Sequence, residues 1–123
     1  RPDAALRLAR NGPAPQAWRL LPKALLRGEA AALAGQAPSA AIEVLQKLCH
    51  DLMAVRAGAV PRFFDLQDLP PAPPAAPLAR WWQSLARAAR TAEHPFNAGL
   101  MTEFLVSEAQ AALNSARAAR PRP

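Results

Sequence analysis

The segment from Pro38 to Gly58 constrains the fold of this 123-residue chain more than any other feature. Its apolar residues recur every three or four positions, which places them on one side of an α-helix. Proline is favoured in the first turn of a helix and glycine just past its end. We therefore expect an amphipathic helix over residues 38–57, closed by Gly58. Its predicted buried side holds Ile42, Leu45, Leu48, Cys49, Leu52, Met53 and Val55. Its polar side holds most of Glu43, Gln46, Lys47, His50 and Asp51.

The rest of the chain is also rich in helix-forming residues. Ala, Leu, Arg, Gln and Glu dominate, tyrosine is absent, and no stretch alternates apolar and polar residues as a β-strand does. Most of the 14 prolines fall between helical stretches and so separate them. The predicted fold is all-α, a small bundle of about five to six helices. Besides 38–57, the expected helices cover residues 3–10, a stretch from about 15, 22–34, 78–93 and 97–118.

The helix expected at 78–93 has two contrasting sides. Its apolar stripe is formed by Leu78, Trp81, Trp82, Leu85, Ala89 and Ala92. Its opposite side carries a basic ridge of Arg80, Arg87 and Arg90. Adjacent helical residues point about 100° apart, so we expect one of Trp81 and Trp82 to be buried and the other to lie nearer an edge. Leu85 is predicted to belong to the core.

The helix expected at 97–118 is apolar around more than half of its circumference. Its polar residues are confined to a narrow strip of Glu103, Ser107, Gln110, Asn114 and Arg117. A helix of this kind is buried on more than one side. It therefore lies either at the centre of the bundle or at an interface.

Residues 59–77 interrupt the helical pattern. Phe63 and Phe64 are expected to tuck against the core. The proline-rich end is expected to run as an extended, polyproline-like connector. The same prolines have the form of a PxxP ligand, but a tether between two helices is the favoured interpretation.

Composition limits the compartment and the class of protein. The single cysteine, Cys49, excludes an internal disulfide and suits a reducing, cytoplasmic compartment. It lies among apolar residues and is predicted to be a buried structural thiol. No run of about 18 apolar residues occurs, so no membrane span is expected. Because the sequence begins at Arg1 and lacks a signal-peptide pattern, we interpret it as a piece excised from a longer protein.

The residues that catalysis requires do not form any recognisable pattern. There is no phosphate-binding GxxxxGK[ST] loop, no GxSxG elbow and no evident pair of catalytic carboxylates. The two histidines, His50 and His94, and Cys49 do not make a typical zinc site. We therefore expect no enzymatic activity, no cofactor, no metal and no small-molecule ligand.

Three segments together carry a resemblance to a known family. They are NGPAPQAWRLL (Asn11 to Leu21), VLQKLCHDLMAVRAGAVPRFF (Val44 to Phe64) and LARWWQSLARAARTAEHPFNAGLMTEFLV (Leu78 to Val106). The first resembles the Gly-x-Pro turn and helix that close the lid of AAA+ clamp-loader subunits. The other two resemble a helix with its Pro-aromatic segment, and the closing helix pair, of the delta-prime subunit of bacterial DNA polymerase III. The match covers nearly the whole chain in order.

This resemblance implies a fold and a function. Residues 1–21 would be the tail of the preceding AAA+ lid region, 22–118 the helical collar domain and 119–123 a disordered tail. The implied function is non-catalytic oligomerisation, which holds the subunit in the heteropentamer that loads the sliding clamp during DNA replication. The implied partners are the delta and gamma/tau subunits, with DNA and the clamp contacted only indirectly. No residue of the turn at 12–16 matches a phosphate-sensing arginine.

The corner between the last two helices is the most telling part of the resemblance. Pro95 lacks an N–H and disfavours helical geometry at His94, so a helix must end there. Asn97 can cap the next helix, and Phe96 can anchor the corner. The corner is thus predicted to shape a surface for a neighbouring subunit. The candidate interface residues are Arg80, Trp81, Trp82, Arg87, Arg90, His94, Phe96, Asn97, Leu100 and Phe104.

The alternative function is a freestanding basic helical domain that binds nucleic acid. The net charge of +6 and the basic ridge favour it. Against it, the charge is dispersed and no helix-turn-helix signature is visible. The two functions differ in their response to salt, because nucleic-acid binding weakens steeply as salt rises and apolar assembly does not.

Overall fold

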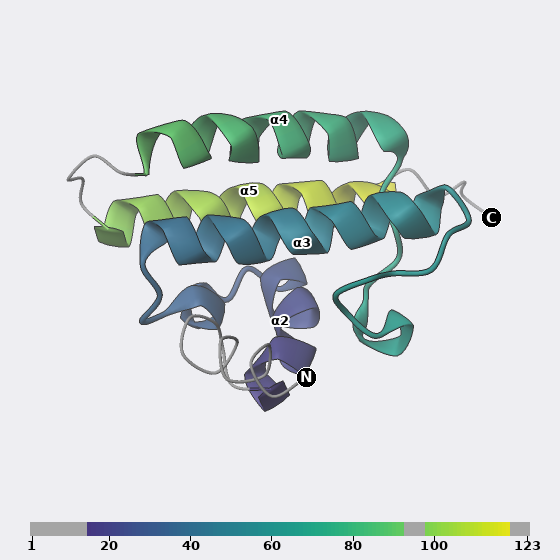
Figure 1. The fold of residues 1–123 in the computed structure, drawn as a ribbon, viewed down its shortest axis with the longest axis horizontal. Coiled ribbons are helices and arrows are strands. Elements are labelled where there is room, and N and C mark those ends of the chain that lie inside the picture. Colours follow the sequence, from purple (N-terminus) through teal and green to yellow (C-terminus); the bar gives the residue numbers. More distant parts are fainter. Residues whose placement is uncertain (1–14, 93–97, 119–123) are drawn as a thin grey trace.

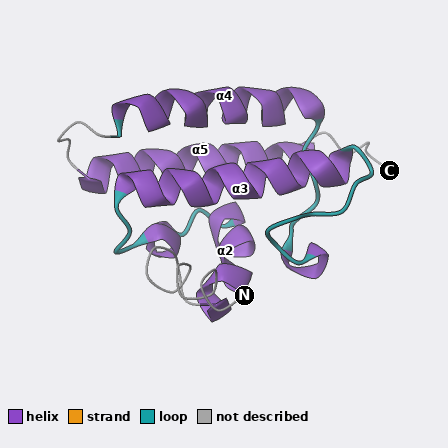
Figure 2. Cartoon of the chain, in the orientation of Figure 1, coloured by secondary structure: helices purple, strands orange, loops and turns teal. Residues whose placement is uncertain are grey.

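The computed structural model of this chain describes residues 15–92 and 98–118. These residues form four α-helices and two short 3-10 helices, with no β-strand among them (Figure 2). The predicted all-α bundle is therefore confirmed, with four α-helices over the described residues in place of the five to six expected for the chain. The predicted helix at 3–10, the corner at 94–97 and the tail at 119–123 lie outside the described residues.

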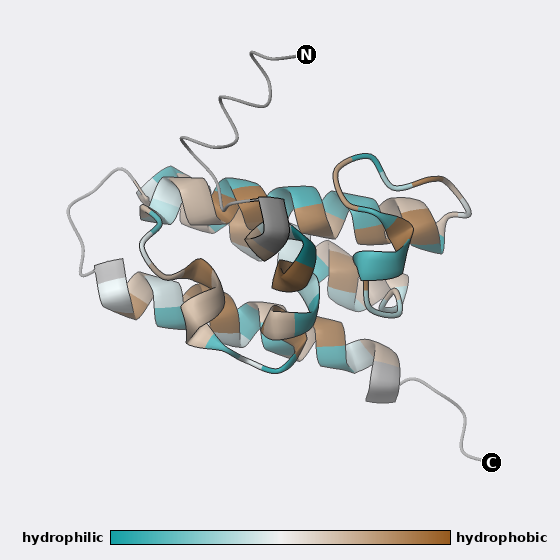
Figure 3. Cartoon of the chain, turned by 90° about the horizontal axis from the view of Figure 1, so that it is seen from below, coloured by the Kyte–Doolittle hydropathy of each residue, from teal (hydrophilic) through white to brown (hydrophobic). Residues whose placement is uncertain are grey.

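Three long helices form the body of the molecule. They are α3 (Pro38–Arg56), α4 (Ala75–Thr91) and α5 (Ala98–Ala118). Figure 1 shows them side by side, with α4 antiparallel to both α3 and α5. The shorter α2 (Pro15–Leu26) lies across this group on the side away from α4 and contacts α5. Teal and brown residues alternate along each long helix in Figure 3, as expected for amphipathic helices.

One hydrophobic core joins all four helices. Ile42, Leu45, Leu48, Cys49, Leu52 and Leu85, the six residues expected in the core, are all buried there. The helix α5 contributes Leu105, Val106, Ala109, Ala112 and Leu113. It contacts α2, α3, α4 and the 3-10 helix at Ala30–Leu33, which accounts for the apolar width of its sequence pattern. The helix therefore lies at the centre of the bundle, and its predicted role at an interface stays a prediction.

The helix α2 differs from the prediction in its extent. The sequence was expected to begin a new helix at Pro22 and continue it to Ala34, but Pro22 lies inside α2, which ends at Leu26. Proline lacks the N–H that would bond the carbonyl of Trp18. Pro22 is itself buried beside Leu21 and Leu25, so packing offsets that loss. The expected domain boundary between residues 21 and 22 falls within this helix.

Glycines end both α2 and α3. Gly28 has a φ of 72° and Gly58 a φ of 87°, in the left-handed region that favours glycine. After α2, the N–H of Gly28 donates to Leu25 and that of Glu29 to Ala24, which is the Schellman arrangement. The sequence predicted the stop at Gly58 correctly. It missed the stop at Gly28, because alanine and leucine continue on both sides of it.

A buried carboxylate fastens the loop that follows α3. Asp51 was expected on the polar side of α3, but it is fully buried. Its Oδ1 accepts the backbone N–H of Arg62 at 2.8 Å, and its Oδ2 accepts those of Phe63 and Phe64 at 2.8 and 2.7 Å. The loop folds back over the side chain, so three charge-assisted bonds from the backbone satisfy the buried charge, and Oδ1 also lies 3.2 Å from Nδ1 of His50. We call this arrangement the Asp51 clasp.

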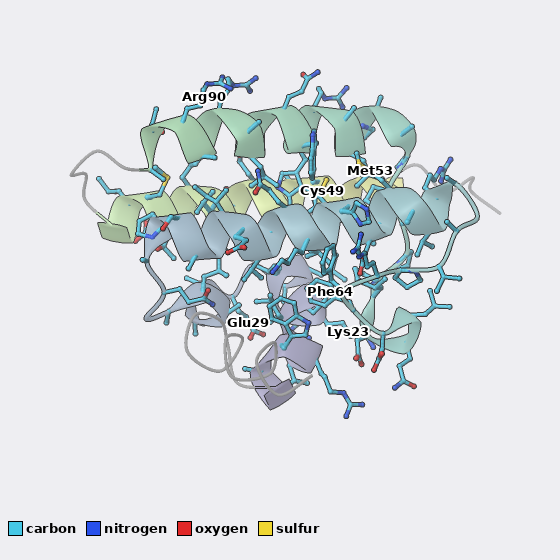
Figure 4. All side chains as sticks on the ribbon, in the orientation of Figure 1. Lys23, Glu29, Cys49, Met53, Phe64 and Arg90 are labelled. Atoms are coloured by element: carbon cyan, nitrogen blue, oxygen red, sulfur yellow. The ribbon has the colours of Figure 1, made fainter. Side chains whose placement is uncertain are left out.

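The same loop is held from its other side by α2. The ring of Phe64 is buried and stacks on Trp18, with ring centroids 4.7 Å apart. The indole N–H of Trp18 donates to the carbonyl of Phe63 at 3.2 Å, and Lys23 donates to that of Gln67 at 3.4 Å. Figure 4 shows Phe64 between α3 and α2. The loop therefore joins α2 to α3.

A proline connector leads from this loop to α4. Pro70 and Pro73 are buried, whereas Pro71 between them is exposed. These prolines pack against the protein itself, which supports the tether and not the PxxP ligand. The helix α4 begins at Ala75, earlier than predicted, because Pro77 in its first turn needs no N–H donor there.

Part of the polar strip of α5 faces α2. The side-chain amide of Asn114 donates to the carbonyl of Leu26, at the end of α2, at 3.3 Å. A Cβ placed on Gly28 would lie 2.5 Å from Oε1 of Gln110, so α2 and α5 approach closely here. These polar residues thus serve contacts within the bundle.

Candidate protein-interaction surface

A groove runs along the seam between α4 and α5. It consists of two adjoining hollows of about 590 and 410 Å³, and both are lined by Ser84, Arg87 and Glu108. We call them together the α4–α5 groove. The apolar end is lined by Ala88, Thr91, Leu100, Met101 and Phe104. The polar end is lined by Pro77, Arg80, Trp81, Ala111, Ala112 and Ser115.

The spacing of residues on α4 explains its side of the groove. Arg80, Ser84, Arg87 and Thr91 recur every three or four positions, so they share one face of the helix. On α5, small side chains such as Ala111 and Ala112 leave room between the helices. The two helices therefore pack together at the base of the groove, and the groove itself is open to solvent.

One polar contact crosses the seam. The hydroxyl of buried Ser84 lies 2.5 and 2.7 Å from the two carboxylate oxygens of Glu108. Because a hydroxyl has a single proton, Ser84 donates one bond that the two oxygens share. This contact fixes α4 against α5 in the middle of the groove. No cation lies within ion-pair distance of Glu108 among the residues that the structure describes.

Large apolar side chains stand exposed at the apolar end. Leu100 is 65% exposed and Phe104 is 49% exposed, although both lie on the helix at the centre of the bundle. Met101 beside them is partly buried and packs against the core. This end of the groove thus offers apolar surface that the described residues leave uncovered.

The basic ridge borders this groove only in part. Arg80, Arg87 and Arg90 are all exposed, and none of them forms an ion pair within residues 15–92 and 98–118. Arg80 and Arg87 line the groove. Arg90 points outward from α4, away from the bundle (Figure 4). Two of the three arginines therefore contribute positive charge to the groove.

The adjacent tryptophans of α4 have different environments. Trp81 is only 3% exposed and belongs to the core, whereas Trp82 is 38% exposed. The indole N–H of Trp81 is buried without a hydrogen-bond acceptor among the described residues. Trp82 does not line the groove. As predicted, one of the two neighbouring tryptophans is buried and the other is more exposed. Because Trp81 is the buried one, it cannot serve as an exposed interface residue.

The structure brings together four of the ten candidate interface residues as exposed groups on one surface. These are Arg80, Arg87, Leu100 and Phe104. The predicted candidates His94, Phe96 and Asn97 lie outside the described residues. Sequence reasoning missed Ser84 and Glu108, and the signal for Ser84 is its position between Arg80 and Arg87 on one helical face.

Cys49 has no feature of a reactive thiol. It is fully buried between α3 and α4, and its Sγ lies 3.6 Å from the carbonyl of Leu78 (Figure 4). Burial disfavours the thiolate and raises the pKa of Cys49 to about 12. A nucleophilic or redox role for this side chain therefore has no support.

Two further properties of the described residues and three comparisons with known proteins bear on function. Among the described residues, no group of three or more His, Cys, Asp and Glu side chains is placed to hold a metal ion. In that same part of the chain, no helix is both long and apolar enough to cross a membrane. Compared with protein-family models, curated proteins and solved structures, the chain matches none of them.

Proposed function

We propose that this chain is a non-catalytic association domain that binds neighbouring subunits through the α4–α5 groove. One observation carries the proposal. Exposed Leu100 and Phe104 share one hollow of the groove with Arg87, and Arg80 lines the adjoining hollow. Neither arginine has an acidic partner among the described residues. Apolar anchors bordered by charge are typical of protein interfaces, in which arginine and aromatic residues are enriched.

The resemblance to delta-prime subunits identifies the assembly that we propose. The chain would belong to the collar of the cytoplasmic clamp loader, a post-AAA+ bundle that holds the subunit in the heteropentamer during DNA replication. Its neighbours would be the delta and gamma/tau subunits, and it would contact DNA and the sliding clamp only indirectly. The three resembling segments, which follow one another in the order of that family, support this assignment.

The groove suits an interface of modest strength. Complete burial of one large apolar side chain stabilises a complex by about 1.5–3 kcal/mol. Because Leu100 and Phe104 are already partly buried, together they offer about 2–3 kcal/mol. A ring distributes its stability over several interfaces, so each can be small. The isolated domain is therefore expected to be monomeric or weakly self-associating.

Two leucines of equal exposure allow a matched test. Leu100 lies in the groove and is 65% exposed, and Leu20 lies on α2 and is 64% exposed. Leu100→Asp and Leu20→Asp are each mixed with collar domains of delta and gamma/tau subunits and analysed by size-exclusion chromatography with light scattering. We expect only Leu100→Asp to be expelled from the hetero-complex. A wild-type domain that forms a tight homo-oligomer and ignores these subunits would contradict the proposal.

Nucleic-acid binding is the second candidate function, and the unpaired basic ridge favours it. A titration with duplex and single-stranded oligonucleotides at several salt concentrations tests it. If the ridge neutralises three phosphates, the affinity should fall with salt at a logarithmic slope of about −3. Substitution of Arg90, which faces away from the groove, would weaken this binding but leave assembly through the groove unchanged.

A further inference from the structure

We infer that the α4–α5 groove binds an acidic amphipathic helix of a partner protein. This inference rests on the proposed association function and specifies the chemistry of the partner. It follows from the change of character along the groove. The apolar end presents Leu100 and Phe104, the polar end presents Arg80, and Arg87 lines both ends.

The positive charge of the groove determines which charge the occupant must carry. Arg80 and Arg87 line the groove and form no ion pair with any carboxylate of the described residues. The carboxylate of Glu108 lies between the two ends and is engaged by Ser84. An occupant that carries carboxylates thus gains two charge-assisted contacts, whereas a basic occupant gains at most one, with Glu108, and is repelled by both arginines.

The geometry of the groove favours a helix as the occupant. Its walls are two antiparallel helices, and a third helix packs readily into the groove between two others. Arg80 and Arg87 are two turns apart, a separation of about 10 Å at 1.5 Å per residue. Two carboxylates about seven residues apart on a helix alongside α4 match this separation. Apolar side chains on the same face of that helix would then reach Leu100 and Phe104.

A second copy of this chain does not meet these requirements. The helix α4 contains Arg80, Arg87 and Arg90 and no acidic residue. A symmetric dimer that packed α4 of one copy against α4 of the other would place their basic ridges together. Like charges held together in this way oppose association. The occupant is therefore a different protein.

A nucleic acid is also a poor match for the groove. Its phosphates would satisfy Arg80 and Arg87, as the carboxylates of an acidic helix would, and Glu108 at the centre repels either anion. The apolar end would gain nothing from a polyanionic backbone, since Leu100 and Phe104 would stay exposed to water. An acidic helix satisfies both ends of the groove.

Labelled helical peptides test this inference with the folded chain. The first peptide has about twenty residues, a stripe of leucines and two glutamates about seven residues apart. Matched peptides carry glutamine or lysine in place of the glutamates. Binding is measured by fluorescence anisotropy to the wild type, to Arg87→Glu and to the control Arg56→Glu. Arg56 is also exposed, but it lies at the end of α3, outside the groove.

We expect the glutamate peptide to bind the wild type and Arg56→Glu with equal affinity and to bind Arg87→Glu about tenfold more weakly. The lysine peptide should show the reverse preference, binding Arg87→Glu more tightly than the wild type. Equal binding of all three peptides, or no binding of the glutamate peptide up to about 1 mM, would overturn the inference. Displacement of the peptide by duplex DNA of similar length would overturn it in favour of nucleic acid.

The same variants separate this inference from the proposed function. If the chain joins the clamp-loader subunits and Arg87→Glu impairs neither assembly nor peptide binding, the inference fails and the proposed function stands. If the peptides behave as expected but the chain does not join those subunits, the inference stands and the proposed assembly is wrong. Circular dichroism of each variant shows whether the fold is retained.

Discussion

Replacing Asp51 by asparagine changes one oxygen of the Asp51 clasp into an NH₂ group and removes its charge. The two oxygens of Asp51 accept three backbone N–H groups, and Asp51 is fully buried. If the asparagine oxygen keeps the bonds to Phe63 and Phe64, its NH₂ group faces the N–H of Arg62, donor against donor. The side chain is nearly isosteric, so the change isolates hydrogen bonding from packing.

The cost follows from the three bonds. A bond to a charged group contributes about 1.5–3 kcal/mol, and this contribution is lost at Arg62. The other two bonds become neutral and weaken by roughly half, about 1 kcal/mol each. Because Arg62 is exposed, water can satisfy part of what is lost there. We therefore expect Asp51→Asn to lower the free energy of unfolding by about 2–4 kcal/mol.

Urea denaturation followed by tryptophan fluorescence measures this loss. Trp18 stacks on Phe64, so its emission also reports whether the loop stays in place. Asp65→Asn is the matched control, because Asp65 is an exposed aspartate in the same loop. This control should change stability by less than about 0.5 kcal/mol. If Asp51→Asn and Asp65→Asn unfold at the same urea concentration, the clasp does not stabilise the fold and the reasoning is refuted.

Three further changes test the packing of the bundle. Leu52→Ala truncates a fully buried core side chain and should cost about 2–5 kcal/mol in urea denaturation; a cost near zero would contradict its place in the core. Gly28→Ala should destabilise more than Gly35→Ala, because both have a positive φ but only the Cβ at Gly28 meets Gln110. The additional Gln110→Ala change should reduce that difference, and an unchanged difference would exclude the contact as its cause. The Cys49 thiol, with its pKa raised by burial from 9.0 to about 12, should resist alkylation at pH 8–9 until the chain unfolds. Between pH 9 and 12 the unfolded thiol ionises and the folded thiol does not, so stability should fall as pH rises, and Cys49→Ala should lack this component.

The sequence predicts the long helices well where their ends are marked by residues with a special backbone role. Pro38 and Gly58 fix α3 to within a residue. The helix start predicted at Pro22 is wrong, because Pro22 lies inside α2. Proline is typical of a helix start but is tolerated inside a helix where its ring is buried. Helical periodicity cannot reveal the burial of Asp51, since that burial comes from a loop 11 to 13 residues further along the chain.

The sequence predicts the exposed residues of the candidate site but not the contact between its two helices. Arg80 and Arg87 follow from their spacing on α4, and Leu100 and Phe104 from the excess of apolar residues on α5. The contact between Ser84 and Glu108 depends on the register between two helices, which the pattern of neither helix encodes. The sequence pattern likewise does not predict the chemistry of the occupant, which we infer from the arginines of the groove that have no acidic partner.

Two buried prolines of the connector before α4 are three residues apart. Pro70 and Pro73 are buried and Pro71 is exposed. The backbone at Leu69 (φ −89°, ψ 140°) and at Pro74 (φ −60°, ψ 161°) is close to the polyproline II conformation. That conformation has three residues per turn and rises about 3.1 Å per residue. Insertion of one residue would turn a buried proline toward water, whereas insertion of three would keep every proline on its side and lengthen the connector by about 9 Å. Insertion of one residue should therefore disturb the packing of this connector more than insertion of three.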